Sequence, residues 1–179
     1  MSAIVVPTIA RVVLADPPWL FSDKLPGKSR GAQKHYPGMT VAEIARFPLP
    51  ELADEAWLFL WRVHTHQEDA AMVMKTWGFD YCAEMIWIKK TTGGKKHFGM
   101  GRTFRNAHEV CIVGKRGRPK PLAMSQRSVF EATVREHSAK PEKMYEIIEA
   151  HSAGPYVELF ARRPRAGWTS YGNQLQEKG

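Results

Sequence analysis

Short hydrophobic runs alternate with amphipathic segments along most of this chain, and that alternation limits the folds it can adopt. Apolar residues recur at helical spacing in 65–77 and 141–151, and 40–46 predicts a short helix. In that short helix we expect Thr40 as N-cap, with Glu43 completing a capping box. Runs rich in β-branched and aromatic residues predict strands at 9–15, 56–63, 80–88, 108–113, 129–134, 156–161 and 168–171. Such an order is typical of an α/β fold with a mostly parallel sheet and helices on both faces.

The length and composition fit one domain with a buried core. The chain has 179 residues, of which 44% are hydrophobic, and it contains no repeat or low-complexity tract. We therefore expect a single domain over residues 1–179, with mobile loops at about 20–40 and 89–105. Loops of that length in a compact domain are more often functional than idle.

The chain is strongly basic, with a formal net charge of +8 and a pI of about 9.6. This balance favours a polyanionic partner, most simply nucleic acid. Ten basic residues against one acid, Glu109, fall within 89–120. Such a run can be merely a solvated face, but here it brackets a glycine-rich stretch. As residues that would contact phosphates on either side of a target base, we single out Lys95, Lys96, Arg102 and Arg105.

Several classes of site and location are disfavoured by the sequence. Cys82 and Cys111 lie in apolar stretches without a CxxC motif, so we expect buried core thiols in a reducing cytoplasm. No apolar run approaches the roughly 20 residues that span a bilayer. The first residues lack the basic region of a signal peptide. Because His64 and His66 are two apart and would face different sides of a helix, we expect no metal site.

The strand predicted at 9–15 runs directly into Asp16-Pro17-Pro18-Trp19. Two prolines end a strand, and Asp before Pro commonly starts a turn, so a purely structural interpretation is open. The chemical interpretation concerns the exocyclic amine of adenine, which is planar and a poor nucleophile. A carboxylate from Asp16 and the Pro17 carbonyl, accepting its two N–H groups, would localise the nitrogen lone pair and stabilise developing positive charge. Pro18 would keep this turn rigid, and Trp19 offers a flat face for a purine.

Asp16-Pro17-Pro18-Trp19 resembles the catalytic motif of the MT-A70 family of S-adenosylmethionine-dependent adenine N6-methyltransferases. Further segments resemble that family in its own order, at 36–50, 56–63, 77–90, 105–117, 137–149 and 157–174. The resemblance covers residues 12–174 and suggests a compact bacterial or phage member. It implies a Rossmann-like methyltransferase sheet with permuted motif order, the catalytic motif first and the cofactor strand last. It also implies S-adenosyl-L-methionine as cofactor.

The same resemblance assigns roles to individual residues. It implies cofactor contacts by Asp16, Lys140, Glu158, Leu159, Phe160, Arg162, Asn173 and Gln174. Among these, Glu158 and Arg162 would lie near the ribose, and Lys140 would meet the methionine carboxylate or the acceptor nucleotide. The implied acceptor contacts are Trp19, Tyr36, Asn106 and Glu109. Independently of the resemblance, we expect Lys140 to be the N-cap of a helix whose first residue is Pro141. Lysine is a poor N-cap, which suggests that it has another function.

We therefore expect methyl transfer to N6 of adenine in nucleic acid, with DNA preferred over RNA because compact stand-alone members are typically bacterial or phage modification enzymes. Two alternatives are a non-catalytic nucleic-acid-binding subunit and a cytosine N4-methyltransferase. The latter more often carries Ser and Tyr at the positions of Asp16 and Trp19. We expect a cytoplasmic monomer or homodimer, or a chain that works with a partner subunit. Because only eleven residues precede Val12, we expect that some contacts to the cofactor adenine, which larger members make before the catalytic strand, come from elsewhere or are missing.

Overall fold

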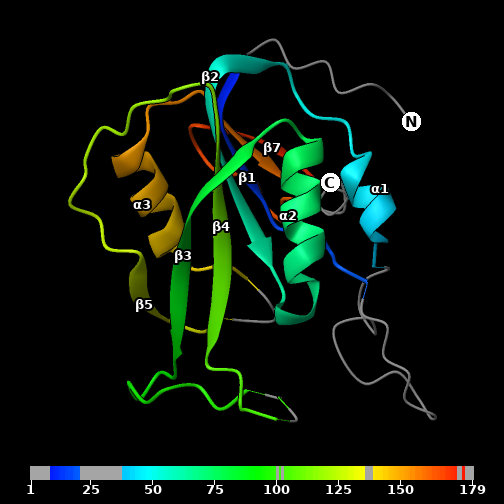
Figure 1. Cartoon of the computed structure of the whole chain (residues 1–179). Helices are drawn as coiled ribbons and strands as arrows, with labels where there is room; N and C mark the ends of the chain where they lie inside the picture. Colours follow the sequence, from blue (N-terminus) through cyan, green and yellow to red (C-terminus); the bar gives the residue numbers. More distant parts are fainter. Residues whose placement is uncertain are drawn as a thin grey trace.

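A computed structural model describes residues 9–20, 38–99, 101, 103–135, 139–172 and 175 (Figure 1). Its seven strands form one sheet in the order β5-β3-β4-β2-β1-β6-β7. The strands are β1 (Ala10–Ala15), β2 (Leu52–Arg62), β3 (Asp80–Lys90), β4 (His108–Arg116), β5 (Val129–Thr133), β6 (Tyr156–Leu159) and β7 (Trp168–Tyr171). The helices are α1 (Val41–Ala45), α2 (Gln67–Thr76), which a 3₁₀ turn η2 (His64–His66) precedes, and α3 (Glu142–His151).

The direction of β4 decides which residues meet at the functional edge of the sheet. Neighbouring strands pair in parallel, except that β4 is antiparallel to both β2 and β3. The ends of the other strands and the start of β4 therefore share one edge, which we call the carboxyl edge. In Figure 1 this edge lies toward the bottom, where β3 connects to β4. The expectation of a mostly parallel sheet is confirmed.

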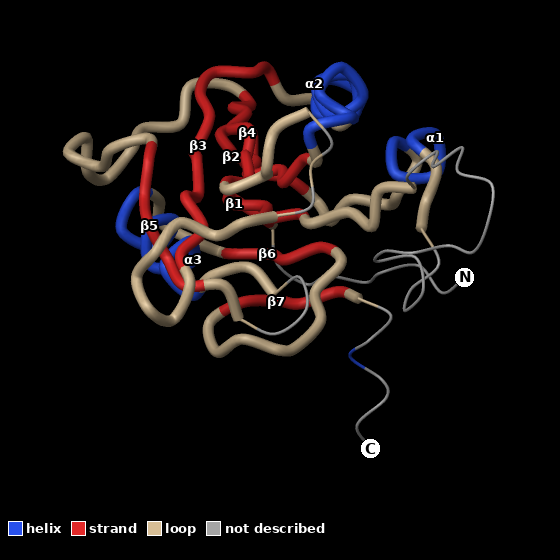
Figure 2. Tube along the Cα trace, turned by 90° about the horizontal axis from the view of Figure 1, so that it is seen from below, coloured by secondary structure: helices blue, strands red, loops and turns tan. Residues whose placement is uncertain are grey.

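Each face of the sheet is covered by its own helices (Figure 2). Successive side chains of a strand point to opposite faces, so β1 sends Val13 to one core and Leu14 to the other. The first core includes Val73 of α2, and α1 also packs there. The second core includes Ile148 of α3. The expected helices on both faces are confirmed.

The two predicted helix starts have different outcomes. The capping box of α1 is present, because Thr40 Oγ1 accepts from the Glu43 N–H at 3.3 Å and the Glu43 carboxylate accepts from the Thr40 N–H at 2.7 Å. For α3, the prediction that Pro141 is the first helical residue and Lys140 the N-cap is wrong. Pro141 is itself the N-cap, because its ψ of 141° is extended while its fixed φ fits either conformation.

The expectation for the two cysteines is half correct. Cys111 is buried in the centre of the sheet, but Cys82 is exposed. Strand β5 pairs only with Ile86–Lys90 of β3, so the earlier half of β3 is a free edge, and a bulge lies between Tyr81 and Ala83. An apolar sequence context gave no sign that this part of the strand lacks a neighbour.

Two other expectations meet the structure only in part. Residues 21–37 of the expected loop at 20–40 lie outside the described residues. The expected loop at 89–105 begins later, because β3 continues to Lys90. Within the described parts of the chain, no helix is long and apolar enough to cross a membrane.

We predict that Gly114→Ala lowers the free energy of unfolding by about 1–3 kcal/mol, as expected for overpacking. A Cβ on this β4 residue would lie 2.9 Å from Met74 Sδ and 3.0 Å from Phe79 Cβ. Gly93→Ala is the matched control, since its Cβ would meet only Thr91 Oγ1 at 3.9 Å. Urea denaturation measures both variants, and equal stability of the two would contradict close packing of β4 against α2.

Candidate active site

The carboxyl edge gathers the polar groups that the sequence separates. Asp16 follows β1, Phe160 follows β6, and Lys140 lies just before α3. Glu109 joins them because β4 runs antiparallel and therefore begins where its neighbours end. A cavity of about 40 Å³ here is lined by Leu14, Asp16, Trp61, Ala139, Lys140, Tyr145, Glu158, Phe160, Arg162 and Arg163.

Lys140 is the centre of an ion network at this edge. Its Nζ lies 2.8 Å from Asp16 Oδ1 and 3.2 Å from Glu109 Oε2, and Lys89 Nζ lies 2.5 Å from Glu109 Oε1. The Lys140 ammonium also lies 5.2 Å from the centre of the Trp61 ring, within cation–π range. The network thus joins the ends of β1 and β3 to the start of β4.

Lys140 and Glu109 of this network keep their charges at neutral pH. Burial by itself lowers the pKa of Lys140, but Asp16 and Glu109 outweigh it and raise that pKa. Burial likewise raises the pKa of Glu109, yet Lys140 and Lys89 together lower it. Opposite charges at this distance favour the charged form of each group. Asp16 is therefore held beside a permanent cation.

A second pair lines the same cavity. The Tyr145 hydroxyl donates to Glu158 Oε1 at 2.7 Å, and Glu158 is only 8% exposed. Burial, with a contribution from the Asp16 charge, raises the pKa of Glu158 to about 7, although the Tyr145 hydrogen bond lowers it. Burial and Glu158 raise the pKa of Tyr145 in turn. A buried carboxyl at the end of a strand suits the hydroxyls of a ribose, for which it can act as acceptor.

The Asp-Pro-Pro-Trp turn is held by its own backbone. The Pro17 carbonyl accepts from the Trp19 N–H at 2.9 Å, and the Pro18 carbonyl accepts from the Met39 N–H at 2.7 Å. A carbonyl has two lone pairs, so Pro17 keeps capacity for a second donor. The turn therefore fixes the direction of the Pro17 carbonyl, while Lys140 holds the Asp16 carboxylate.

Trp19 differs from its expected role. Its ring is only 5% exposed, and its Nε1 donates to the Trp61 carbonyl at 3.0 Å. The His66 ring lies 5.5 Å from it, centre to centre. The structure gives Trp19 an anchoring role, tying the turn to the end of β2, and leaves no open ring face for the predicted purine stacking.

The chain after β6 is tightly constrained. Phe160 has a φ of +61°, a left-handed conformation that bulky residues rarely adopt. Such strain is often found at functional sites. Its ring packs 4.4 Å from that of Phe47, whereas the Leu159 side chain is fully buried in the core, so only its backbone can serve the site. A Cβ on Gly172, after β7, would collide with the Ala161 carbonyl, so the two chain segments touch directly.

The remaining predicted residues fall into two groups, one away from the lining of this cavity and one outside the described residues. Four lie on the connection between β3 and β4, namely Lys95, Lys96, Arg105 and Asn106. Four others fall outside the described residues, namely Tyr36, Arg102, Asn173 and Gln174. The described residues contain no group of three or more His, Cys, Asp or Glu that could hold a metal ion.

Sequence reasoning missed four members of the site, namely Trp61, Lys89, Tyr145 and Arg163. Trp61 and Lys89 lie at or near strand ends, so the rule that selected Asp16 would have selected them too. Tyr145 lies on α3, and no local signal shows that this helix faces the end of β6. Arg163 directly follows Arg162, which the sequence did point to, so the same strand end could have suggested both arginines.

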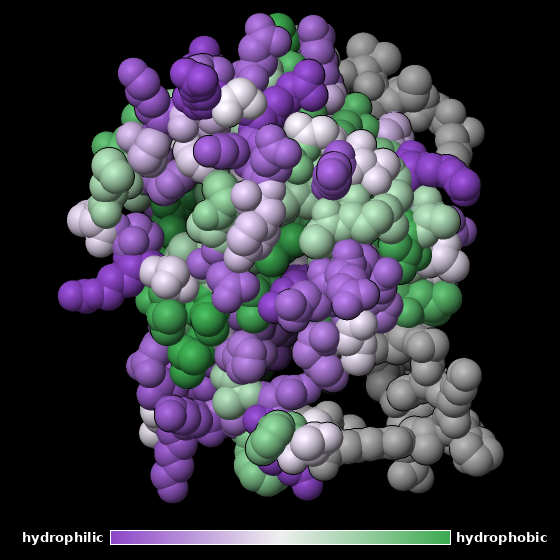
Figure 3. Space-filling model, viewed as in Figure 1, coloured by the Kyte–Doolittle hydropathy of each residue, from purple (hydrophilic) through white to green (hydrophobic). Residues whose placement is uncertain are grey.

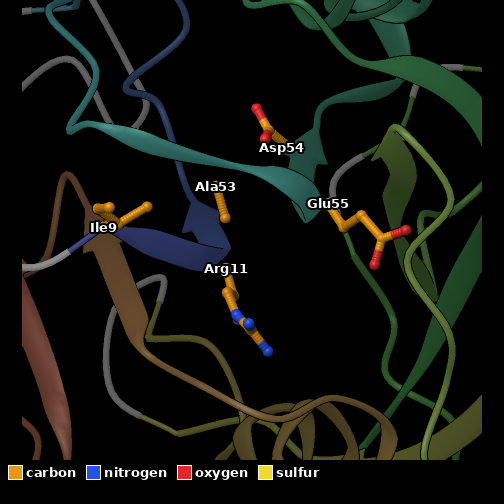
Figure 4. Close-up of a pocket in the computed structure, with 5 residues that line it drawn as sticks. All are labelled: Ile9, Arg11, Ala53, Asp54 and Glu55. Carbon is orange, nitrogen blue, oxygen red and sulfur yellow. The ribbon is translucent and has the colours of Figure 1, made fainter.

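A larger cavity, about 380 Å³, lies at the opposite edge of the sheet (Figure 4). Its lining residues come from the starts of β1 and β2. In Figure 4, Arg11, Asp54 and Glu55 point in different directions, and no polar groups converge. Ligand sites in open α/β sheets lie outside the carboxyl ends of the strands, which favours the smaller cavity beside Asp16.

We predict that Lys140→Gln lowers the free energy of unfolding by about 2–4 kcal/mol at pH 7, because it removes the cation between Asp16 and Glu109 and leaves only Glu109 paired, through Lys89. Lys143→Gln, three residues later, is the control and should cost at most about 0.5 kcal/mol. Its partner Glu146 forms an exposed pair with it. Urea denaturation of both variants measures the free energy of unfolding. A loss in Lys140→Gln no larger than that in Lys143→Gln would contradict a stabilising network.

We predict that Glu158→Gln gains stability over the wild type as pH rises from about 4.5 to 7. The pKa of Glu158 is raised from 4.5 to about 7 in the fold, so in this window the unfolded chain ionises first and wild-type stability falls. The difference should approach about 3 kcal/mol at pH 8. Urea midpoints at several pH values measure it. A difference that does not change with pH would contradict it.

Comparison with known proteins identifies the family of this chain. Residues 10–174 match the MT-A70 family model. The chain is 35% identical over 170 residues to a putative N(6)-adenosine-methyltransferase MT-A70-like protein of Medicago truncatula, covering 92% of this chain and 26% of that protein. It is 34% identical to the human N(6)-adenosine-methyltransferase catalytic subunit METTL3, covering 92% of this chain and 28% of that protein.

A more distant relative is the mouse N(6)-adenine-specific methyltransferase METTL4, 26% identical over 180 residues, or 91% of this chain and 37% of that protein. The chain thus spans between about a quarter and about a third of the length of these relatives. The matched region runs from the first residue of β1 past the end of β7, and so includes every strand and helix described. The chain belongs to the MT-A70 family.

Proposed function

We propose that this chain transfers a methyl group from S-adenosyl-L-methionine to N6 of an adenine in nucleic acid. The observation that carries the proposal is the position of Asp16. Its carboxylate lies at the carboxyl edge, 2.8 Å from the Lys140 ammonium, in the cavity that Glu158 also lines. Asp16 is a fixed carboxylate that can accept an N–H of an exocyclic amine. Glu158 lies beside it and can accept the hydroxyls of a ribose, so the pair suits methylation of an amine by a nucleoside cofactor.

The groups at the edge fit the cofactor that MT-A70 methyltransferases use, S-adenosyl-L-methionine. Glu158 would hold the ribose hydroxyls, and Lys140 would meet the carboxylate of the methionine part. Trp61 Nε1 is buried without a hydrogen-bond partner among the described residues and lines the same cavity, so it offers a free donor. Because the cavity is only about 40 Å³, well below the roughly 300 Å³ of small ligand sites, the cofactor would lie across the open edge.

When bound, the cofactor supplies an electrophilic methyl group on a positively charged sulfur. Asp16 would accept one N–H of the adenine amine and the Pro17 carbonyl the other, which orients the nitrogen lone pair toward that methyl group. Methylation would remove one proton from the amine nitrogen, and Asp16 would be the carboxylate beside it that accepts this proton. These acceptors stabilise charge that exists only in the transition state, so they accelerate the step.

The nature of the acceptor is the finer part of the proposal. We propose DNA ahead of RNA as the acceptor; the mouse relative is named for adenine, while the plant and human relatives are named for adenosine. We also propose a monomer or homodimer as the working unit, with a partner subunit as the alternative. A non-catalytic nucleic-acid-binding role and cytosine N4 methylation remain the competing functions.

We predict that the protein, given methyl-labelled S-adenosyl-L-methionine and matched DNA and RNA oligonucleotides, labels adenine at N6. Digestion to nucleosides and mass spectrometry identify the product. Asp16→Ala should lower transfer at least about a hundredfold while cofactor binding stays measurable by calorimetry. Asp54→Ala, an exposed aspartate at the other edge, is the control and should keep full activity.

Label on cytosine alone, or no label with any acceptor, would overturn the proposed reaction. An active Asp16→Ala variant would remove Asp16 from the mechanism. Label on RNA and not on DNA would keep the reaction and reverse the proposed acceptor preference.

A further inference from the structure

The connection between β3 and β4, residues 91–107, presents two exposed aromatic rings. Phe98 is 73% exposed and Phe104 is 82% exposed. Phenylalanine is among the residues most often buried, and neither ring belongs to either hydrophobic core of the described residues. Two such rings within seven residues are therefore a feature that folding does not explain.

Close backbone contacts join described residues from the two arms of the connection. A Cβ on Gly99 would collide with the Asn106 carbonyl, and one on Gly101 would collide with the Phe104 carbonyl. The two arms of the connection therefore touch through their backbones at positions where only glycine fits. The Arg105 guanidinium lies 4.8 Å from the centre of the Phe98 ring, which couples a cation to one of the exposed aromatic faces.

The connection is attached directly to the candidate active site. The His97 N–H donates to the Lys89 carbonyl at 2.8 Å, and the Lys89 N–H donates to the Ala107 carbonyl at 2.8 Å. The side chain of that same Lys89 forms the 2.5 Å pair with Glu109, which in turn contacts Lys140. One residue therefore links both arms of the connection to the ion network around Asp16.

The charge of the connection is entirely positive. Residues 91–107 contain Lys95, Lys96, Arg102 and Arg105 and no acid. Lys95, Lys96 and Arg105 are exposed. Figure 3 shows hydrophilic and hydrophobic surfaces side by side in the lobe at the bottom of the molecule, where Figure 1 places this connection. Exposed cations among aromatic rings are complementary to a polynucleotide with accessible base faces.

We propose that residues 91–107 bind single-stranded nucleic acid beside the target adenine. Phe98 and Phe104 stack on unpaired neighbouring bases, while Lys95, Lys96 and Arg105 contact phosphates. A duplex covers both faces of each internal base with its neighbours, so exposed phenylalanine rings gain stacking only from an unpaired strand. The identity of the target base rests on the proposed function, whereas the preference for an unpaired strand follows from this surface.

Fluorescence anisotropy with the full chain tests the proposal, using labelled single-stranded oligonucleotides that contain adenine and their matched duplexes. The wild type should bind the single strand at least about tenfold more tightly than the duplex. Phe98→Leu and Phe104→Leu keep apolar volume but remove the ring, and each should weaken single-strand binding about tenfold. Phe98→Trp and Phe104→Trp should keep the affinity.

Two controls separate stacking from charge and from aromatic loss in general. Lys95→Gln should reduce the slope of log affinity against log salt by about 1, whereas the leucine variants should leave the slope unchanged. Tyr81→Leu removes an aromatic ring that is 57% exposed at the other end of β3 and should leave binding unchanged.

Equal affinity for single strand and duplex, or wild-type affinity in both leucine variants, would overturn the proposal. A change of oligomeric state in Phe98→Leu with unchanged nucleic-acid affinity would also overturn it, by showing a protein-docking surface. Because binding is read without methyl transfer, the two proposals fail separately. Ring-dependent binding without transfer would refute only the reaction, and transfer with ring-independent binding would refute only this surface.

Discussion

The Lys140 ammonium joins three chain segments that lie far apart in the sequence: the turn after β1, the start of β4 and the start of α3. A lysine this little exposed is costly unless it is paired, and both Asp16 and Glu109 lie within 3.2 Å of it. The arrangement is possible because β4 alone runs against its neighbours, so that Glu109 stands at the edge where β1 ends. Strand direction therefore comes first, and the charge network depends on it.

The charge of Asp16 also acts on the hydrogen-bonded pair Tyr145 and Glu158. Asp16 raises the pKa of Glu158 as well as that of Lys140, so one carboxylate acts on two groups of opposite sign. A cation bound beside Asp16 would reduce that repulsion and favour the ionised form of Glu158. Because S-adenosyl-L-methionine carries a positive sulfur, its binding and the ionisation of Glu158 would support each other, provided that both occupy this edge. Asp16 and Glu158 are in this sense electrostatically coupled.

The sequence was sufficient where local pattern decides the outcome. Neighbouring residues are enough to predict the Thr40–Glu43 capping box and the end of the strand before Asp16. They also predict the alternation of strands and helices, although not the direction of β4. The sequence was insufficient where the outcome depends on which strands become neighbours. Cys82 is exposed because β5 pairs only with the later half of β3, and Trp19 is buried with its indole N–H bound to the carbonyl at the end of β2. Tyr145 could be found only once α3 was placed over the end of β6.

The site thus combines two parts with different physical requirements. The edge around Asp16 is rigid, since proline, buried tryptophan and paired charges fix its acceptors before any ligand arrives. The connection at 91–107 instead keeps its cations and rings in solvent, where they can meet strands of any sequence. Precise geometry suits the reacting amine, because misplacement by an ångström is costly in rate. Sequence-tolerant stacking and phosphate contact suit the flanking nucleotides, whose identity the chemistry does not use. Lys89 belongs to both parts, because its backbone binds both arms of the connection and its side chain pairs with Glu109 of the ion network.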